Sequence, residues 1–280
     1  MINLDLLGKT FGPYEMTYTW RDVILYNLGI GAKATDLHYV YERAKGGLKV
    51  CPSFATITTY RPLFSLLEKL NIELKTVLHG EEFIRLFEPI PSEGTILTEV
   101  KVAGIYDKAK AALVELETTS QDKAGKKLFE TTMSIFCRGL GGWGGDPGPK
   151  KPVYDVPKDR PPDFTVTEKI PENQAALYRL SGDYNPLHID PEFAQAAGLP
   201  KPILHGLCTF GFTVRALIDQ VCEGNVDMLK SFGCRFSNVV YPGDTLTISG
   251  WKMEPGIYHL SVSTERGDVL SGVRAEVTKE

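Results

Sequence analysis

Residues 178–212 read YRLSGDYNPLHIDPEFAQAAGLPKPILHGLCTFGF, and this stretch decides how the rest of the chain is interpreted. Asp183 and His188 stand five positions apart. On one continuous helix they would be rotated by roughly 140° from one another and could not converge. Pro186 disfavours helix at the residue before it, which predicts a turn. A carboxylate and an imidazole on one tight loop can reach the same small molecule, and an acid/base pair needs that geometry.

The same loop also has an ordinary interpretation as a turn with no chemistry. Asp and Asn are favoured turn residues because their side chains bond their own backbone, and residues 182–186 contain both. A single histidine is likewise more often structural than catalytic. The loop alone leaves both interpretations open.

The residues after the loop predict a helix that begins near Gly206. Arg215 and Asp219 give this helix an amphipathic end. Backbone N–H groups at a helix N-terminus can hold a carbonyl oxygen on which negative charge develops, and glycine lets a ligand approach them closely. Acid, base and oxyanion donors together predict chemistry beside a carbonyl group. The apolar residues at helical spacing are Leu207, Phe210, Val214, Leu217, Ile218 and Val221.

The pattern D-x-N-P-x-H-x-D at residues 183–190, with K-P-I-L-H-G-L at residues 201–207, resembles the signature of the (R)-specific enoyl-CoA hydratases. These enzymes are the MaoC-like branch of the hotdog fold. The run on to residue 212 resembles hydratase 2, found as a domain of peroxisomal multifunctional enzyme type 2 and as separate proteins. The resemblance covers essentially the whole chain. It implies an α+β double hotdog, with two repeats that each wrap an antiparallel sheet around a helix, the first repeat being degenerate.

The resemblance also implies an activity, the reversible hydration of trans-2-enoyl-CoA to (3R)-3-hydroxyacyl-CoA in fatty acid metabolism. Asp183 and His188 would hold the water, Asn185 would orient it, and the Gly206 N–H would bind the thioester oxygen. The reaction would need no metal and no redox cofactor, and the protein would be a homodimer. Two alternatives are an acyl-CoA thioesterase on the same fold and a non-catalytic acyl-CoA-binding module.

Further residues are implied to bind the acyl-CoA. Lys108 also fits a solvated charge beside Lys110, and His79 also fits a helix cap. The implied substrate-binding residues are His79, Gly80, Lys108, Tyr184, Pro186, Leu187 and Phe236.

Composition restricts the classes of protein. The chain has 280 residues, 42% of them hydrophobic and 24% charged, which predicts a soluble protein of one large or two medium domains. A net charge of −4 argues against a general nucleic-acid surface, although a local basic patch could bind a phosphorylated ligand. No apolar run reaches the length of a membrane span.

Cysteines and termini indicate the compartment. The 5 cysteines are scattered and form no C-x-x-C pair, which favours a reducing compartment over a zinc or disulfide framework. Cys208 could share a helix face with His205 as a nucleophile, but cysteine in an apolar helix is more often a core residue. Without a signal peptide or a terminal Ser-Lys-Leu, we expect a cytoplasmic protein, or a peroxisomal one if the chain is a domain of a multifunctional enzyme.

Three short echoes in the same order predict a duplication. An L-Y-x-L core recurs at residues 25–28 and 177–180, Leu-His-Gly at 78–80 and 204–206, and a Gly-led strand start at 94–98 and 243–247. The first half lacks the carboxylate and imidazole, so only the second half can do acid/base work. The shorter distance after Gly80 predicts that the first half has only a shortened helix there, and we expect an acyl chain in the volume this leaves.

The expected boundaries follow from composition. Residues 1–138 form the first repeat, 163–280 the second, and the Gly- and Pro-rich residues 139–162 a linker that lacks the G-K-[ST] of a phosphate loop. Alternating residues between turn signals predict antiparallel strands after each helix. These strands are expected at residues 97–106, 111–117 and 129–136, and at 234–236, 245–249, 257–262 and 270–277.

Overall fold

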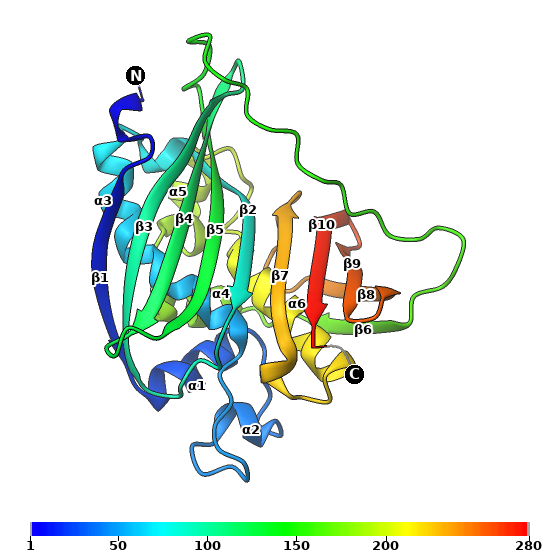
Figure 1. Cartoon of the computed structure of the whole chain (residues 1–280). Helices are drawn as coiled ribbons and strands as arrows, with labels where there is room; N and C mark the ends of the chain where they lie inside the picture. Colours follow the sequence, from blue (N-terminus) through cyan, green and yellow to red (C-terminus); the bar gives the residue numbers. More distant parts are fainter. Residues whose placement is uncertain (1, 279–280) are drawn as a thin grey trace.

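The computed structural model describes residues 2–278, and its strands form one antiparallel sheet in the order β1-β3-β4-β5-β2-β7-β10-β9-β8-β6 (Figure 1). The first five strands in this order and the last five, taken from the outside in, have the same connectivity. This symmetry confirms the duplication and the α+β double hotdog. The strands are β1 (Thr10–Tyr18), β2 (Val77–Leu86), β3 (Gly94–Asp107), β4 (Ala111–Asp122), β5 (Lys127–Arg138), β6 (Phe164–Lys169), β7 (Leu229–Phe236), β8 (Thr245–Glu254), β9 (Ile257–Thr264) and β10 (Gly267–Val277).

The two repeats meet where β2 pairs with β7, over five residue pairs from Glu81–Arg235 to Arg85–Ser231. The helices pack on the inner side of the sheet behind the strands in Figure 1. The α-helices are α1 (Trp20–Gly29), α2 (Leu37–Val40), α3 (Tyr60–Lys69), α4 (Gln174–Tyr178), α5 (Pro191–Ala196) and α6 (Gly206–Val221). Short 3-10 helices are η1 (Leu4–Leu6), η2 (Pro52–Thr59), η3 (Leu74–Thr76), η4 (Arg179–Ser181), η5 (Pro186–His188) and η6 (Val226–Met228).

Helix α6 confirms the predicted start at Gly206, but its amphipathic end is not exposed as expected. Residues 207–218 are all buried, because α6 runs under the sheet and against the first repeat. Arg215 is 3% exposed, and its guanidinium bonds Glu168 Oε1 at 2.9 Å and the carbonyl of Ile30 at 3.1 Å. The charge is thus paired inside the protein rather than solvated.

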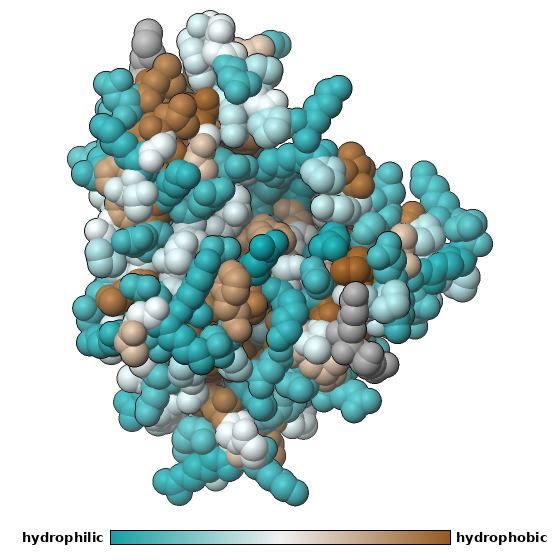
Figure 2. Space-filling view, in the orientation of Figure 1, coloured by the Kyte–Doolittle hydropathy of each residue, from teal (hydrophilic) through white to brown (hydrophobic). Residues whose placement is uncertain are grey.

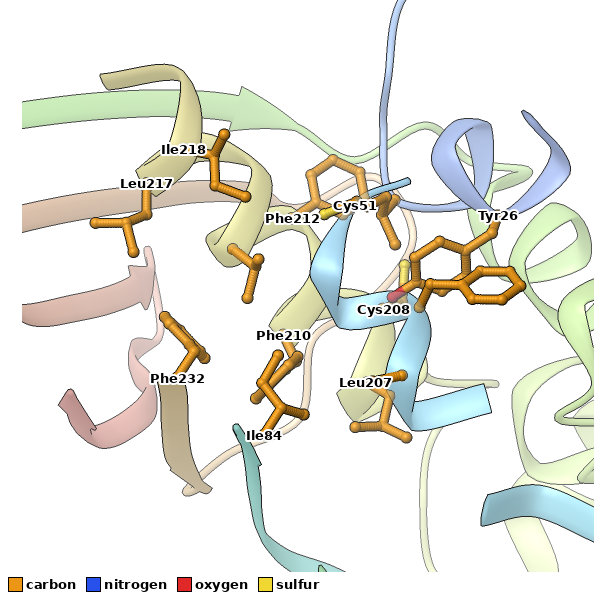
Figure 3. Close-up of a cluster of buried hydrophobic side chains, with 14 of the residues drawn as sticks. Tyr26, Cys51, Ile84, Leu207, Cys208, Phe210, Phe212, Leu217, Ile218 and Phe232 are labelled. Atoms are coloured by element: carbon orange, nitrogen blue, oxygen red, sulfur yellow. The ribbon is translucent and has the colours of Figure 1, made fainter. Parts of the chain in front are cut away.

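The main core joins the two repeats around α6. Figure 3 shows Phe210 of α6 facing Phe232 of β7 and Ile84 of β2, and the two phenyl rings meet edge to face at 4.8 Å. A Cβ on Gly211 would lie 2.3 Å from Ile30 Cγ2, so α6 can pack this closely on the first repeat only because it carries glycine there. A second apolar cluster, around Leu66 and Leu70, lies within the first repeat.

For one of the three repeated motifs, Leu-His-Gly, the predicted correspondence between the two halves is wrong. Residues 78–80 lie in strand β2, which corresponds to β7, and not at a helix start like His205 and Gly206. The helical segments of the first repeat, η2 and α3, come before β2. His79 is therefore no helix cap, and the expected shortened helix after Gly80 does not exist in the described chain. Leu-His-Gly alone is too short to distinguish a strand from a helix start.

The linker between β5 and β6, all of which is described, contains no helix or strand and runs along the protein surface (Figure 1). Asp107 holds its first part by accepting bonds from the N–H groups of Gly142 and Gly144. Lys151 pairs with Glu81 and Glu115 on the outer face of the sheet. That side of the molecule is mostly hydrophilic in Figure 2. Within the described residues, we find no helix of the length and apolarity that a membrane crossing requires.

Candidate active site

The loop between η4 and η5 carries Asp183 and Asn185, and His188 is the last residue of η5. Asn185 Oδ1 accepts the N–H of Leu187 at 3.1 Å, which caps η5, and Asp183 Oδ1 accepts the N–H of Asn185 at 3.2 Å. The two side chains therefore do make the local bonds of an ordinary turn. The second carboxylate oxygen of Asp183 takes no part in the turn and lies 4.0 Å from His188 Nε2. The loop is therefore both an ordinary turn and a place where a carboxylate meets an imidazole, because Asp183 Oδ1 bonds within the turn and Oδ2 faces His188.

His188 has a defined tautomer. It is 8% exposed, and its Nδ1 lies 3.0 Å from the carbonyl oxygen of Ile203, which can only accept. Nδ1 therefore carries the proton, and Nε2 offers a lone pair towards Asp183. Burial lowers the pKa of His188, against an opposing effect of the Asp183 carboxylate, so the ring is neutral near pH 7. The 4.0 Å between Nε2 and Oδ2 is too long for a direct hydrogen bond, but a water molecule can bridge the two atoms.

His205 supports both residues, a role that the sequence did not reveal. Its ring stacks on His188 with centroids 3.7 Å apart, and its Nε2 donates to the backbone oxygen of Asp183 at 3.3 Å. Tyr178 packs near the same ring at 4.9 Å. His205 Nδ1 is buried with no partner in the described part of the chain, and burial holds the pKa of His205 well below its usual value. His205 is therefore a neutral, rigid support. Its sequence signal was its place beside Gly206, but stacking cannot be deduced from that.

Gly206 opens α6 with a free backbone donor. His205 occupies the N-cap position with extended backbone angles and makes no side-chain cap bond. Among the described residues, no acceptor takes the N–H of Gly206, which lies in the wall of the main cavity. Phe236 covers the glycine closely, because a Cβ there would meet its ring at 3.1 Å. The site therefore has an amide donor at a helix N-terminus, as the sequence predicted.

A cavity of about 390 Å³ unites these groups and is lined by both repeats. The first repeat contributes an apolar wall of Leu63, Leu74, Val77, Met133 and Ile135. Of the predicted site residues, the cavity is lined by Asp183, Asn185, Leu187, His188, Gly206, His79 and Phe236.

The remaining predicted residues lie outside the cavity wall. Gly80 forms an irregularity in β2, and Pro186 is the first residue of η5. Lys108 sits in the turn between β3 and β4 and donates to the carbonyl of Pro147. Tyr184 is 57% exposed and lines a second cavity of about 320 Å³, which shares Tyr60 and Phe64 with the first.

Three potential metal ligands lie close together at this site. Asp183, His188 and His205 each bring one atom within 4.8 Å of the others. However, His188 Nδ1 and His205 Nε2 both donate to backbone carbonyls, so those nitrogens carry protons. Asp183 Oδ2 and His188 Nε2 keep free lone pairs 4.0 Å apart, and a water molecule can bridge these two atoms.

Comparison with known proteins agrees with the signature in residues 183–207. Residues 16–139 match the family model of the MFE-2 hydratase 2 N-terminal domain, and residues 155–273 match that of the MaoC like domain. Enoyl-CoA hydratase ChsH3 of Mycobacterium tuberculosis is 40% identical over 284 residues, which cover 97% of this chain and 98% of that protein. The chain belongs to the hydratase 2 family.

Other similar proteins support this hydratase 2 assignment over the whole length. Peroxisomal enoyl-CoA hydratase 2 of Arabidopsis thaliana is 39% identical over 291 residues, covering 95% of this chain and 93% of that protein. The crystal structure of a MaoC-like dehydratase from Phytophthora capsici superposes with a TM-score of 0.90 at 32% identity, covering 100% of this chain and 99% of that one. The resemblance seen in the sequence is thus confirmed for the family and for the fold.

Proposed function

We propose that this protein hydrates trans-2-enoyl-CoA reversibly to (3R)-3-hydroxyacyl-CoA in fatty acid metabolism, with β-oxidation as the setting. One observation carries the proposal: Asp183 Oδ2 and His188 Nε2 lie 4.0 Å apart on the same cavity as the free N–H of Gly206. Hydration needs an acid and a base around one water molecule and a donor for the thioester oxygen. The relatives named enoyl-CoA hydratase support the same substrate class.

The reaction can be followed at these atoms. A water molecule held between Asp183 and His188 attacks C3 of the enoyl thioester and loses a proton to the pair. The electrons of the C2=C3 double bond move to the thioester oxygen, which the Gly206 N–H stabilises as it becomes enolate-like. A proton from the pair then reaches C2 and completes the product. Asn185 keeps the loop in shape through its bond to Leu187.

The apolar wall of the first repeat is proposed to hold the acyl chain. Leu63, Leu74 and Met133 line the cavity and offer no charge to an alkyl chain. Phe236, which packs on Gly206, would contact the substrate near the thioester. Lys108, remote from the cavity wall, would meet only the CoA portion outside the cavity.

The proposed reaction uses no metal ion and no redox cofactor. We expect turnover to survive a strong chelator, and restoration of activity by added Zn²⁺ after chelation would contradict this. We also propose a homodimer, to be tested by light scattering on the purified chain. The compartment, cytoplasmic or peroxisomal, stays a prediction that localisation of the tagged chain would test.

A panel of trans-2-enoyl-CoAs of rising chain length, with chiral analysis of the product, tests the function. We expect the conjugated enoyl absorbance to fall and the (3R) alcohol to form. Release of free CoA thiol without loss of the double bond would identify a thioesterase instead. Tight binding of every enoyl-CoA without turnover would identify a binding module with a vestigial acid/base pair.

A further inference from the structure

A buried carboxylate lies in the middle of the ten-stranded sheet, outside the catalytic loop. Glu82 of β2 is 1% exposed and pairs with Met133 of β5 on one side and Cys234 of β7 on the other. It therefore stands at the seam of the two repeats, on the inner face of the sheet. Buried carboxylates are costly unless they are bonded, so Glu82 depends on the partners that the fold brings to it.

Glu82 bonds to His79, which lines the active-site cavity. His79 Nε2 lies 3.0 Å from Glu82 Oε2 and 3.1 Å from the carbonyl oxygen of Glu81. Both partners are acceptors, so Nε2 carries a proton. The Oε1 atom of Glu82 is buried without a partner in the described part of the chain, so its bonding to protein depends on His79. Burial raises the pKa of Glu82, against an opposing effect of the bond from His79.

A β-bulge makes the pair geometrically possible. Residues three apart in a regular strand point to opposite faces of the sheet. In β2 the register with β5 passes from His79–Ile135 to Glu81–Ser134, so Gly80 is skipped. His79 and Glu82 then oppose Ile135 and Met133, two residues apart, and share the inner face. A Cβ on Gly80 would lie 3.1 Å from the carbonyl oxygen of Ser134, so the bulge favours glycine.

The ring of Phe236 lies between the Glu82–His79 pair and the N–H of Gly206 proposed to bind the thioester oxygen. The rings of His79 and Phe236 lie 4.6 Å apart, and Phe236 packs directly on Gly206. His79 Nδ1 bonds to no described group and is not enclosed, so it remains available to a ligand in the cavity. Glu82, His79, Phe236 and Gly206 thus contact one another in turn, and the last three line the cavity beside the place proposed for the thioester.

We propose that Glu82 is a positioning residue that holds the His79 imidazole beside Phe236, so that Nδ1 faces the amide-containing pantetheine arm next to the thioester. Glu82 touches no substrate atom and acts through His79. This inference rests on the proposed function for the identity of the ligand. It adds a determinant of thioester binding that belongs to the first repeat, where no acid/base chemistry takes place.

The test measures the affinity of the intact protein for decanoyl-CoA, a saturated thioester that cannot be hydrated. Glu82→Met removes the acceptor at similar side-chain length and should weaken binding about tenfold, the effect of one lost positioning hydrogen bond. Glu82→Gln keeps an acceptor for His79 and should stay within about threefold of wild type. With decenoyl-CoA as substrate, Glu82→Met should raise KM more than it lowers kcat.

Two comparisons separate positioning from general damage. Glu81→Gln, on the opposite face of the same strand, is the matched control and should bind decanoyl-CoA like wild type. In a His79→Ala background, Glu82→Met should have no further effect on affinity, because Glu82 would act only through the missing ring. Because His79 Nε2 keeps the Glu81 carbonyl as an acceptor and the buried carboxylate is removed, Glu82→Met should leave the melting temperature equal or higher.

Three results would overturn the proposal: wild-type affinity in Glu82→Met, equal losses in Glu82→Met and Glu82→Gln, or the full loss persisting without His79. If Glu82→Met does not fold, the comparison of Glu82→Gln with His79→Ala decides the matter, because only His79→Ala should then lose affinity. A wild-type protein that binds decanoyl-CoA but hydrates no enoyl-CoA would refute the proposed reaction and leave this inference standing.

Discussion

The two repeats share a strand order but use their polar residues differently. The L-Y-x-L motifs begin in helices α1 and α4 and place the ring centroids of Tyr26 and Tyr178 6.1 Å apart. After α4 the chain forms the loop of Asp183 and His188, whereas after α1 it has only Ile30, Gly31 and Ala32. In the first repeat, the buried Asn27 instead bonds the carbonyls of Tyr39 and Lys49, each at 2.9 Å. This buried polar group of the first repeat thus bonds to backbone within the protein, whereas Asp183 and His188 of the second repeat face the cavity.

The helices of the repeats differ in a way that makes room for a ligand. In the second repeat α6 is one regular helix of 16 residues. In the first repeat the corresponding segment is split into the 3-10 helix η2 and the ten-residue α3, whose Tyr60, Leu63 and Phe64 line the cavity. The comparison teaches that one copy of a duplicated fold can lack the acid/base residues and instead form part of the cavity wall beside the copy that carries them.

The proposed difference between the repeats requires that hydration depends on Asp183 and His188 of the second repeat. Asp183→Asn and His188→Ala should each lower kcat/KM for a decenoyl thioester about a thousandfold, or about 4 kcal/mol, as expected when one member of an acid/base pair is removed. Asp268→Asn, at an exposed position of the same repeat, is the control and should have wild-type kinetics. Near-normal turnover by either site variant would remove the assignment.

The dependence of the second repeat on the first can be tested at Arg215. Arg215→Ala leaves Glu168, whose side chain is 10% exposed, without its 2.9 Å partner and frees the carbonyl of Ile30. We expect the free energy of unfolding to fall by about 3 kcal/mol, measured by urea denaturation. The double variant with Glu168→Gln should recover the part of the loss that comes from the unpaired carboxylate, and a loss near zero in Arg215→Ala would mean that neither the Glu168 pair nor the bond to the Ile30 carbonyl across the repeats stabilises the fold.

The site histidines should make the protein less stable in mild acid. Burial lowers the pKa of His188 and of His205 in the folded state, so below pH 6.5 the unfolded chain binds protons that the native protein does not. Stability should therefore fall as pH drops from 6.5 towards the folded pKa values, by up to about 1.4 kcal/mol per pH unit for each histidine. Urea midpoints at several pH values measure this.

His205→Phe, which keeps an aromatic ring against His188, should reduce the slope of unfolding free energy against pH. An equal slope in wild type and variant would show that His205 is protonated as readily in the native state as in the unfolded one. For the same reason the acid limb of kcat/KM should have its midpoint below pH 6.5, because His188 stays neutral to lower pH.

The smallest expected effect concerns the preference for acyl-chain length, which we propose depends on the part of the cavity wall that the first repeat supplies. Phe64 of α3 is 40% exposed and lines both the 390 Å³ cavity and the second one of about 320 Å³. Phe64→Ala should connect them and raise the ratio of kcat/KM for long over short enoyl-CoAs, by about 1 kcal/mol, the burial of one or two methylenes. Phe64→Trp should shift the ratio the other way, and unchanged ratios in both would place the acyl chain elsewhere.

The sequence predicted the elements whose cause is local. The apolar period after Gly206 marked α6, and Pro186 marked the turn that holds Asp183 near His188. The expected strands lie within β3, β4 and β5 and within β7 to β10, because turn residues separate them. Strands β1, β2 and β6 were not predicted: β1 contains Gly12-Pro13, which is typical of a turn, and β2 begins with the misleading Leu-His-Gly.

The features that were missed depend on residues far apart in the chain. Arg215 can be buried only because Glu168 and the carbonyl of Ile30 meet it, and neither is near it in sequence. The stacking of His205 on His188 needs the η5 loop folded back onto the start of α6. The pairing of His79 with Glu82 needs a bulge, and no residue pattern announces a change of strand parity at Gly80.

The ladder between β2 and β7 also joins the two walls of the cavity. Five residue pairs of a continuous sheet cross the boundary between the copies, and α6 fills the space beneath them. Because backbone pairing ties the two copies together across this boundary, both walls of the cavity belong to one continuous sheet. Leu78, which is 44% exposed and borders the cavity, lies on β2 beside this boundary. The cavity therefore exists only when both copies are folded together.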